Sequence, residues 1–206
     1  MKKSFLIGIV AAISLSSCYK EEVKPAQSII YNDDFTEDTD LSWTYSKKDT
    51  ITSKISDGRL SITNGKTYDA IMVTNTINID ESKDFSIISP ITKTTTSNSN
   101  GFGIVWGRKT SEDSYYYFAI SQNGAYQIVK VENNELTYLK ETTAYSNINT
   151  GANTLKITKS GNMLIFRIND EKVFSTPFQP FFGNDVGYIV GSKNEGISAD
   201  FLAVYQ

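Results

Sequence analysis

The chain has 206 residues, a formal net charge of −3, no histidine and one cysteine. Without histidine there is no Ser-His-Asp triad, Cys-His pair or histidine-ligated zinc, and a single cysteine excludes an intrachain disulfide. Nucleic-acid binders concentrate positive charge to meet phosphates, so we expect no nucleic-acid partner. The hydrophobic content of 39% and the length allow one globular domain with a well-buried core.

Residues 1–17 have the pattern of a signal peptide. Two lysines follow Met1, and Phe5 begins an apolar run of roughly ten residues, which is too short to remain as a membrane-spanning helix. The Leu-Ser-Ser-Cys sequence that ends at Cys18 resembles the lipobox of bacterial lipoproteins. The resemblance implies cleavage before Cys18 and a membrane anchor of acyl chains on that residue. The alternative is an ordinary secretory signal with an incidental cysteine.

The residues after the cysteine predict the location of the protein in the cell envelope. Lys20, Glu21 and Glu22 resemble the surface-export signal of Bacteroidetes lipoproteins, which implies an outer-membrane lipoprotein exposed at the cell surface. The alternative is a solvated, charged tether. Residues 18–27 are polar and include Pro25, so we expect a lipidated N-terminus and linker, followed by one domain over residues 28–206.

From residue 28 onward, apolar and polar residues alternate with a period of two. The pairs Asp57-Gly58, Asn133-Asn134 and Asn169-Asp170 predict hairpin turns between such segments. Strands are expected, in chain order, at residues 59–63, 85–91, 101–107, 115–120, 126–131, 136–139, 155–159, 164–168, 172–174, 186–190 and 197–205. About 12–14 short strands predict an all-β, two-sheet antiparallel sandwich. A closed barrel or a smaller immunoglobulin-like domain fits this pattern less well.

Several stretches carry a resemblance to a known fold. Residues 101–107 (Gly-Phe-Gly-Ile-Val-Trp-Gly) with residues 116–126, the later residues 153–169, and the closing residues 186–191 and 199–205 resemble strands of concanavalin A-like jelly rolls. More narrowly, they resemble the laminin-G-like and 3-keto-disaccharide-hydrolase-like lipoproteins of Bacteroidetes. The resemblance extends from about Tyr31 to Tyr205 and implies a jelly-roll sandwich, but it specifies fold better than activity. Residues expected between the two sheets are Phe102, Ile104, Trp106, Tyr116, Phe118 and Ile120.

Aromatic rings are the first candidates for ligand binding, because their faces stack on the apolar face of a pyranose while neighbouring polar groups bind its hydroxyls. Each of these rings also fits a role in the core or in a cross-strand pair. The ligand-binding candidates are Trp43, Tyr68, Trp106, Arg108, Tyr115 and Tyr117.

The acidic residues do not predict a catalytic site. Retaining glucanases of this fold carry a Glu-x-Asp-x-x-Glu strand, and the sequence has none. Because the first and last strands are expected to be neighbours, Asp33, Asp34 and an inward-facing Asp200 are candidates for a structural calcium site, although hydrogen bonds at a strand end fit them better. We predict no catalytic residue and no cofactor.

The sequence therefore predicts a surface-anchored lipoprotein whose β-sandwich binds a glycan without catalysis. Two other functions stay open. One is a hydrolase acting on a glycoside or keto-disaccharide, and the other is an envelope or adhesion module that binds protein.

Overall fold

A computed structural model describes residues 27–36, 43–45, 51–65, 70–95, 101–191 and 193–206. Cys18, the predicted signal peptide, residues 19–26 and Tyr68 lie outside these ranges. Within them, no helix has the length and apolar character needed to cross a membrane. The described part contains one short 3-10 helix, η2 (Thr110–Glu112), and sixteen strands, which are β1 (Ile29–Asp33), β2 (Thr44–Tyr45), β3 (Ile51–Ile55), β4 (Leu60–Asn64), β5 (Ile71–Thr76), β6 (Phe85–Lys93), β7 (Phe102–Lys109), β8 (Ser114–Ser121), β9 (Ala125–Glu132), β10 (Glu135–Ala144), β11 (Asn153–Ser160), β12 (Met163–Ile168), β13 (Glu171–Pro177), β14 (Asp185–Val190), β15 (Gly196–Ala199) and β16 (Leu202–Tyr205).

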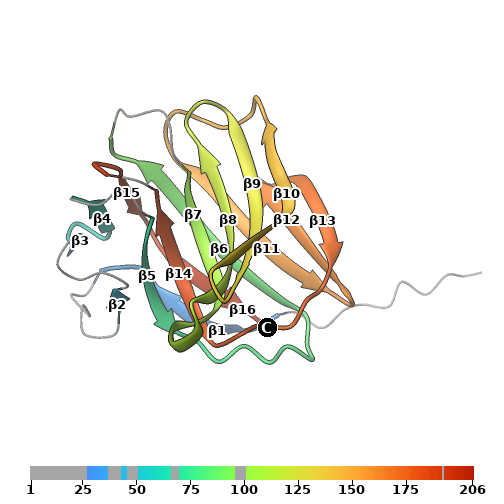
Figure 1. The fold of residues 1–206 in the computed structure, drawn as a ribbon. Coiled ribbons are helices and arrows are strands. Elements are labelled where there is room, and N and C mark those ends of the chain that lie inside the picture. The colour runs from blue at the N-terminus through green and yellow to red at the C-terminus, as the bar shows by residue number, and fades with distance from the viewer. Residues whose placement is uncertain (1–26, 37–42, 46–50, 66–69, 96–100, 192) are drawn as a thin grey trace, which may run out of the picture.

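The strands form two antiparallel sheets that pack face to face (Figure 1). The seven-stranded sheet has the order β10-β9-β8-β7-β14-β5-β2. The nine-stranded sheet has the order β13-β12-β11-β6-β15-β4-β3, with β16 paired to both β6 and β1. The predicted all-β sandwich is confirmed, and so is the expected pairing of the first strand with the last.

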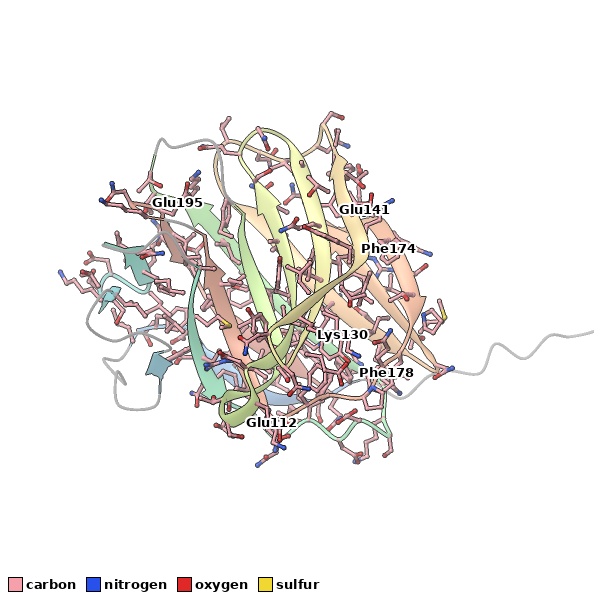
Figure 2. All side chains as sticks on the ribbon, viewed as in Figure 1. Glu112, Lys130, Glu141, Phe174, Phe178 and Glu195 are labelled. Atoms are coloured by element: carbon pink, nitrogen blue, oxygen red, sulfur yellow. The ribbon has the colours of Figure 1, made fainter. Side chains whose placement is uncertain are left out.

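Alternate residues of both sheets fill the space between them (Figure 2). On β7 and β8 the six residues expected in the core are all buried, with Trp106, Ile104 and Phe118 at 0% exposure. Phe174 and Phe178 pack against the edge of this core. The period-two pattern predicted these positions because successive side chains of a strand point to opposite faces.

Three of the turns have the conformation that their residues predict. Both central residues are left-handed at Asp57-Gly58 (φ 55° and 68°), at Asn133-Asn134 (φ 50° and 67°) and at Asn169-Asp170 (φ 51° and 66°). Such turns match the right-handed twist of hairpin strands, and Asn, Asp and Gly tolerate this backbone conformation best.

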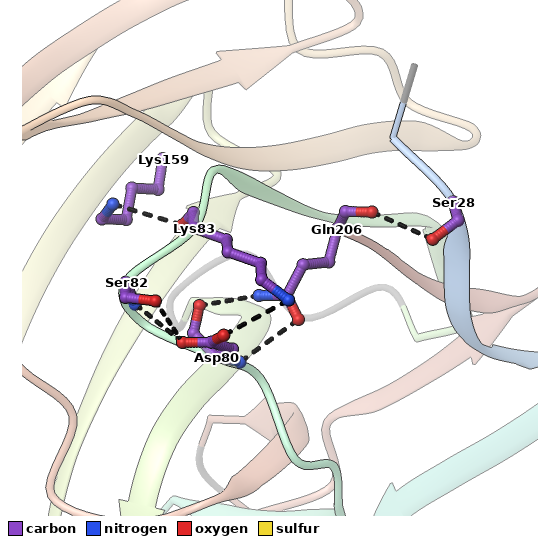
Figure 3. A network of polar contacts seen from close by, with 6 residues as sticks. All are labelled: Ser28, Asp80, Ser82, Lys83, Lys159 and Gln206. Carbon is purple, nitrogen blue, oxygen red and sulfur yellow. Dashed lines mark hydrogen bonds and ion pairs between the residues drawn. The ribbon is translucent and has the colours of Figure 1, made fainter. Parts of the chain in front are cut away.

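Hydrogen bonds join residues near the two ends of the described chain (Figure 3). Backbone hydrogen bonds of 2.7 and 2.8 Å join Ser28 and Gln206. The Gln206 side chain in turn donates to the backbone oxygen of Asp80 at 2.7 Å, and Lys83 pairs with the Asp80 carboxylate at 3.4 Å. The described chain therefore enters and leaves the sandwich at the same place.

Candidate functional site

The seven-stranded sheet has a second apolar cluster on the face turned away from the core. It consists of Met72, Val105, Tyr117, Ala119, Val129, Val131 and Ile189, with Tyr115 packed against it. Cross-strand pairing aligns Val105 with Tyr117 and Tyr117 with Val129, so β7, β8 and β9 contribute to one continuous surface. We call this surface the outer apolar face.

Two tyrosines of β8 lie along this face. The ring centroids of Tyr115 and Tyr117 are 6.3 Å apart, with an interplanar angle of 34°. Burial raises the pKa of Tyr117 to about 12 and also raises the pKa of Tyr115. Both hydroxyls are therefore neutral at physiological pH and can donate hydrogen bonds.

Strand β10 adds two exposed side chains to the same face. Tyr138 pairs with Val129 and Leu136 pairs with Val131, so both share the face of their partners. Tyr138 is 49% exposed and Leu136 is 51% exposed, which makes them accessible to a ligand. Neither residue is among the ligand-binding candidates that the sequence predicts. The alternation of apolar and polar residues in this segment could have indicated that Leu136 and Tyr138 share a face. Their accessibility, however, depends on the position of β10 at the edge of the sheet.

A polar hollow of about 230 Å³ lies on the same side, beside the turn between β8 and β9. Its polar side chains are Ser121, Asn123, Gln127 and Thr142, and its apolar floor includes Ala119 of the outer apolar face. Gln127 accepts a hydrogen bond from Thr142 at 3.0 Å and donates one to the hydroxyl of Tyr117 at 3.3 Å. The hollow and the tyrosines are therefore parts of one connected surface.

Arg108 lies at the other end of β7 and is 3% exposed. Its Nη1 donates to the hydroxyl of Thr74 at 3.2 Å, while its buried Nε has no hydrogen-bond partner. The positive charge of Arg108 acts on Tyr115, whose pKa it lowers against the larger effect of burial. Arg108, Tyr115 and Tyr117, three of the predicted candidates, thus come together on one side of the sheet.

The two tryptophan candidates lie elsewhere. Trp43 is 4% exposed, stacks on Tyr188 at 5.8 Å and donates to the carboxylate of Asp33 at 3.0 Å. Trp106 is fully buried and stacks on Tyr116 at 5.5 Å. Both rings belong to the core between the sheets and present no face to a ligand, so neither is part of the candidate site.

The acids considered for calcium are engaged in local contacts. Asp33 accepts hydrogen bonds from Trp43 and from the backbone of Phe35, and Asp34 accepts from Thr36. The expectation that Asp200 faces inward is wrong: its side chain is 41% exposed and pairs with Arg59 at 3.0 Å. Among the described residues, no group of three or more potential metal ligands comes together.

No family model matches the sequence, and no curated protein matches it significantly. Solved structures do match the fold. A protein of unknown function with a galectin-like fold from Bacillus subtilis has a TM-score of 0.61 and 11% identity, over 88% of this chain and 97% of that one. The carbohydrate-binding module CBM66 from Bacillus subtilis has a TM-score of 0.54 and 14% identity, over 80% of this chain and 92% of that one. LamA from Z. galactanivorans, in complex with laminaritriose and laminaritetraose, has a TM-score of 0.58 and 11% identity, over 88% of this chain and 100% of that one.

Together, the strand order and these similarities define the class: the chain folds as a two-sheet antiparallel sandwich of the jelly-roll and galectin-like kind. At 11–14% identity, the likeness shows the fold alone.

Proposed function

We propose that this protein is a glycan-binding lipoprotein that binds its ligand without catalysis, on the outer apolar face and in the adjoining hollow. The observation that carries the proposal is the composition of that face. The outer face of a sheet is normally polar, yet here it is built of valines and of Tyr117, which are at most 9% exposed, and Tyr138 and Leu136 lie exposed beside them.

The chemistry of the surface suits a sugar. A pyranose has one apolar face and several hydroxyls, so it needs a flat apolar partner beside hydrogen-bond donors and acceptors. The ring of Tyr138 supplies an accessible flat surface, and Gln127, Thr142 and Asn123 supply amide and hydroxyl groups in the hollow. The solved structures of this fold include a carbohydrate-binding module and a protein in complex with laminarioligosaccharides, which supports the same proposal.

Binding can be tested by electrophoresis of the purified protein through gels that contain different polysaccharides. We expect retardation by at least one of them and, for Tyr138→Ala, about tenfold weaker binding, because a stacked aromatic ring contributes about 0.5–1.5 kcal/mol beyond its buried area. Met163→Ala is the matched control, since Met163 is a 39% exposed apolar side chain on the nine-stranded sheet. Failure of every polysaccharide to retard the protein would contradict the proposal, and release of shorter sugars would contradict its non-catalytic part.

The anchor is a separate part of the proposal. We propose that Cys18 carries acyl chains and that Lys20, Glu21 and Glu22 direct the protein to the cell surface. Radiolabelled palmitate should enter the wild-type protein but not Cys18→Ser. Replacing the three charged residues with alanine should remove access of external protease on whole cells, and unchanged access would refute the export signal.

A further inference from the structure

We infer from Arg108 that the glycan is acidic and that its carboxylate or sulfate group binds at the η2 end of the outer apolar face. This inference rests on the proposed function and adds the chemical class of the ligand. Arg108 brings a positive charge to the surface that carries Tyr115, which lies at the same end of β8.

Arg108 has unused capacity to donate hydrogen bonds. The side chain is 3% exposed, yet its one hydrogen bond to a described residue goes to the neutral hydroxyl of Thr74. Its Nε is buried without a partner, and no carboxylate in the described ranges forms an ion pair with it. A buried charge is costly unless it is paired, so this arrangement favours an anion supplied from outside the domain.

The path of the side chain places it on the outer side of the sheet. Arg108 belongs to β7 and Thr74 to β5, and β14 lies between these strands. The hydrogen bond to Thr74 therefore takes the side chain of Arg108 across β14. Gly187 is the residue of β14 that pairs with Thr74, and it has no side chain to obstruct that path. A Cβ at Gly187 would come within 2.1 Å of the backbone oxygen of Val73, so this position is restricted to glycine.

The carboxylate that pairs in register with Arg108 has other partners. Asp185, which pairs with Arg108 in register, accepts hydrogen bonds from Thr76 at 2.8 Å and from Thr110 at 2.9 Å. Burial raises the pKa of the Tyr115 hydroxyl, Asp113 raises it further, and Arg108 lowers it. Among the described residues the guanidinium therefore has no ion pair, and the hydroxyl of Tyr115, at the same end of the sheet, can donate a second hydrogen bond.

A carboxylate or sulfate group matches this pair of donors. Guanidinium groups bind planar and tetrahedral oxyanions with two parallel hydrogen bonds, and such charge-assisted bonds are about twice as strong as neutral ones. Tyr115 and Tyr117 would contact the sugar ring that carries the acid, and the hollow would receive a neighbouring sugar. The run from Tyr115 to Ser121 spans about 20 Å at the usual rise per strand residue.

The test uses the purified protein in affinity gels with pectate and alginate, which carry carboxylates, and with carrageenan, which carries sulfates. Each is compared with its neutral form, obtained by carboxyl reduction or desulfation. We expect an acidic polysaccharide to bind at least tenfold more tightly than its neutral form, and binding to weaken from 50 to 500 mM salt. Preference for pectate or alginate assigns the group as a carboxylate, and preference for carrageenan assigns it as a sulfate.

Arg108→Met keeps most of the side-chain volume and removes the charge. It should weaken binding of the acidic form about tenfold or more and change binding of the neutral form less than twofold. Arg59→Met is the matched control, because Arg59 is exposed and pairs with Asp200 on the nine-stranded sheet. The melting temperature of Arg108→Met should equal or exceed that of the wild type, since a merely structural arginine would instead lower it when replaced.

The possible outcomes separate the two proposals. Equal binding of acidic and neutral forms, or full acidic binding by Arg108→Met, overturns the acidic-ligand inference and leaves glycan binding standing. Failure of all acidic polysaccharides while a neutral one binds has the same meaning. If no polysaccharide of either kind binds, both the inference and the proposed function are overturned.

Discussion

The two sheets of this sandwich differ on the faces that they turn away from each other. On the nine-stranded sheet, the outward positions of β11 and β12 are mostly half-buried polar residues, namely Thr154, Lys156, Thr158 and Arg167, beside the apolar Met163 and Ile165. On the seven-stranded sheet, the outward Val105 and Val129 are fully buried in a second apolar cluster. The nine-stranded sheet follows the usual pattern for a solvated face, so the surface that calls for a functional explanation is on the seven-stranded one.

The sheets also differ in how each holds a buried cation. Lys93, at the end of β6 in the nine-stranded sheet, pairs with Glu195 at 2.9 Å, and their side chains are 1% and 2% exposed. Arg108, in the seven-stranded sheet, has no such carboxylate among the described residues. The cation of Lys93 is paired within the domain, whereas Arg108 has a buried donor, Nε, without a hydrogen-bond partner.

The largest effect is expected from removing the buried cation of the nine-stranded sheet. Lys93→Met takes away the cation that faces Glu195 and should lower the free energy of unfolding by about 3–5 kcal/mol. Arg108→Met should cause no loss, and the double variant Lys93→Met/Glu195→Leu should recover most of the loss seen in the single one. Urea denaturation measures all three variants. Equal losses in Lys93→Met and Arg108→Met would remove the contrast between the two sites.

A smaller effect should separate the two outer faces. Val129→Ala removes two carbon atoms from the fully buried part of the outer apolar face and should cost about 2 kcal/mol. Thr154→Ala, on the outer side of the nine-stranded sheet, should stay within about 0.5 kcal/mol of the wild type. Chemical denaturation provides the comparison, and similar costs would show that the outer apolar face is not a packed cluster.

The fold could be predicted largely from local signals. Alternation assigned Trp106, Phe118 and their neighbours to the core because a strand places successive side chains on opposite faces. The same rule failed at Asp200. The expected continuous strand over residues 197–205 is divided into β15, which ends at Ala199, and β16, which begins at Leu202. Alternation does not continue through that bend, and Asp200 therefore faces solvent.

The candidate site was harder to predict because it depends on pairing between strands. Tyr115, Tyr117 and Arg108 could be selected from their positions on two neighbouring strands. The sequence could not show that Trp43 differs from these candidates, since an aromatic residue in the core and one in a binding site occur in the same local sequence pattern. Tyr138 and the hollow depend on the register of β10, which shifts twice along β9, and no local pattern in the sequence specifies such shifts.

The smallest effect at neutral pH concerns two adjacent tyrosines of β8 that face opposite ways. Burial raises the pKa of Tyr116 and of Tyr117 to about 12, from a usual value near 10. The unfolded chain therefore loses these protons first, so the contribution of these tyrosines to the free energy of unfolding should be constant below pH 10 and fall between pH 10 and 12. Tyr116→Phe and Tyr117→Phe should each reduce that fall, measured by urea denaturation from pH 9 to 12.

At pH 7 the same two variants should differ from each other. Tyr116 donates a hydrogen bond to the backbone oxygen of Pro180 at 3.0 Å, so its replacement by phenylalanine leaves that acceptor without this donor and should cost about 1 kcal/mol. The hydroxyl of Tyr117 instead accepts a longer, 3.3 Å bond from Gln127, a residue that lines the hollow and also bonds Thr142. Tyr117→Phe should therefore cost less stability than Tyr116→Phe while weakening glycan binding. The reverse order would mean that the Tyr117 hydroxyl serves packing rather than recognition.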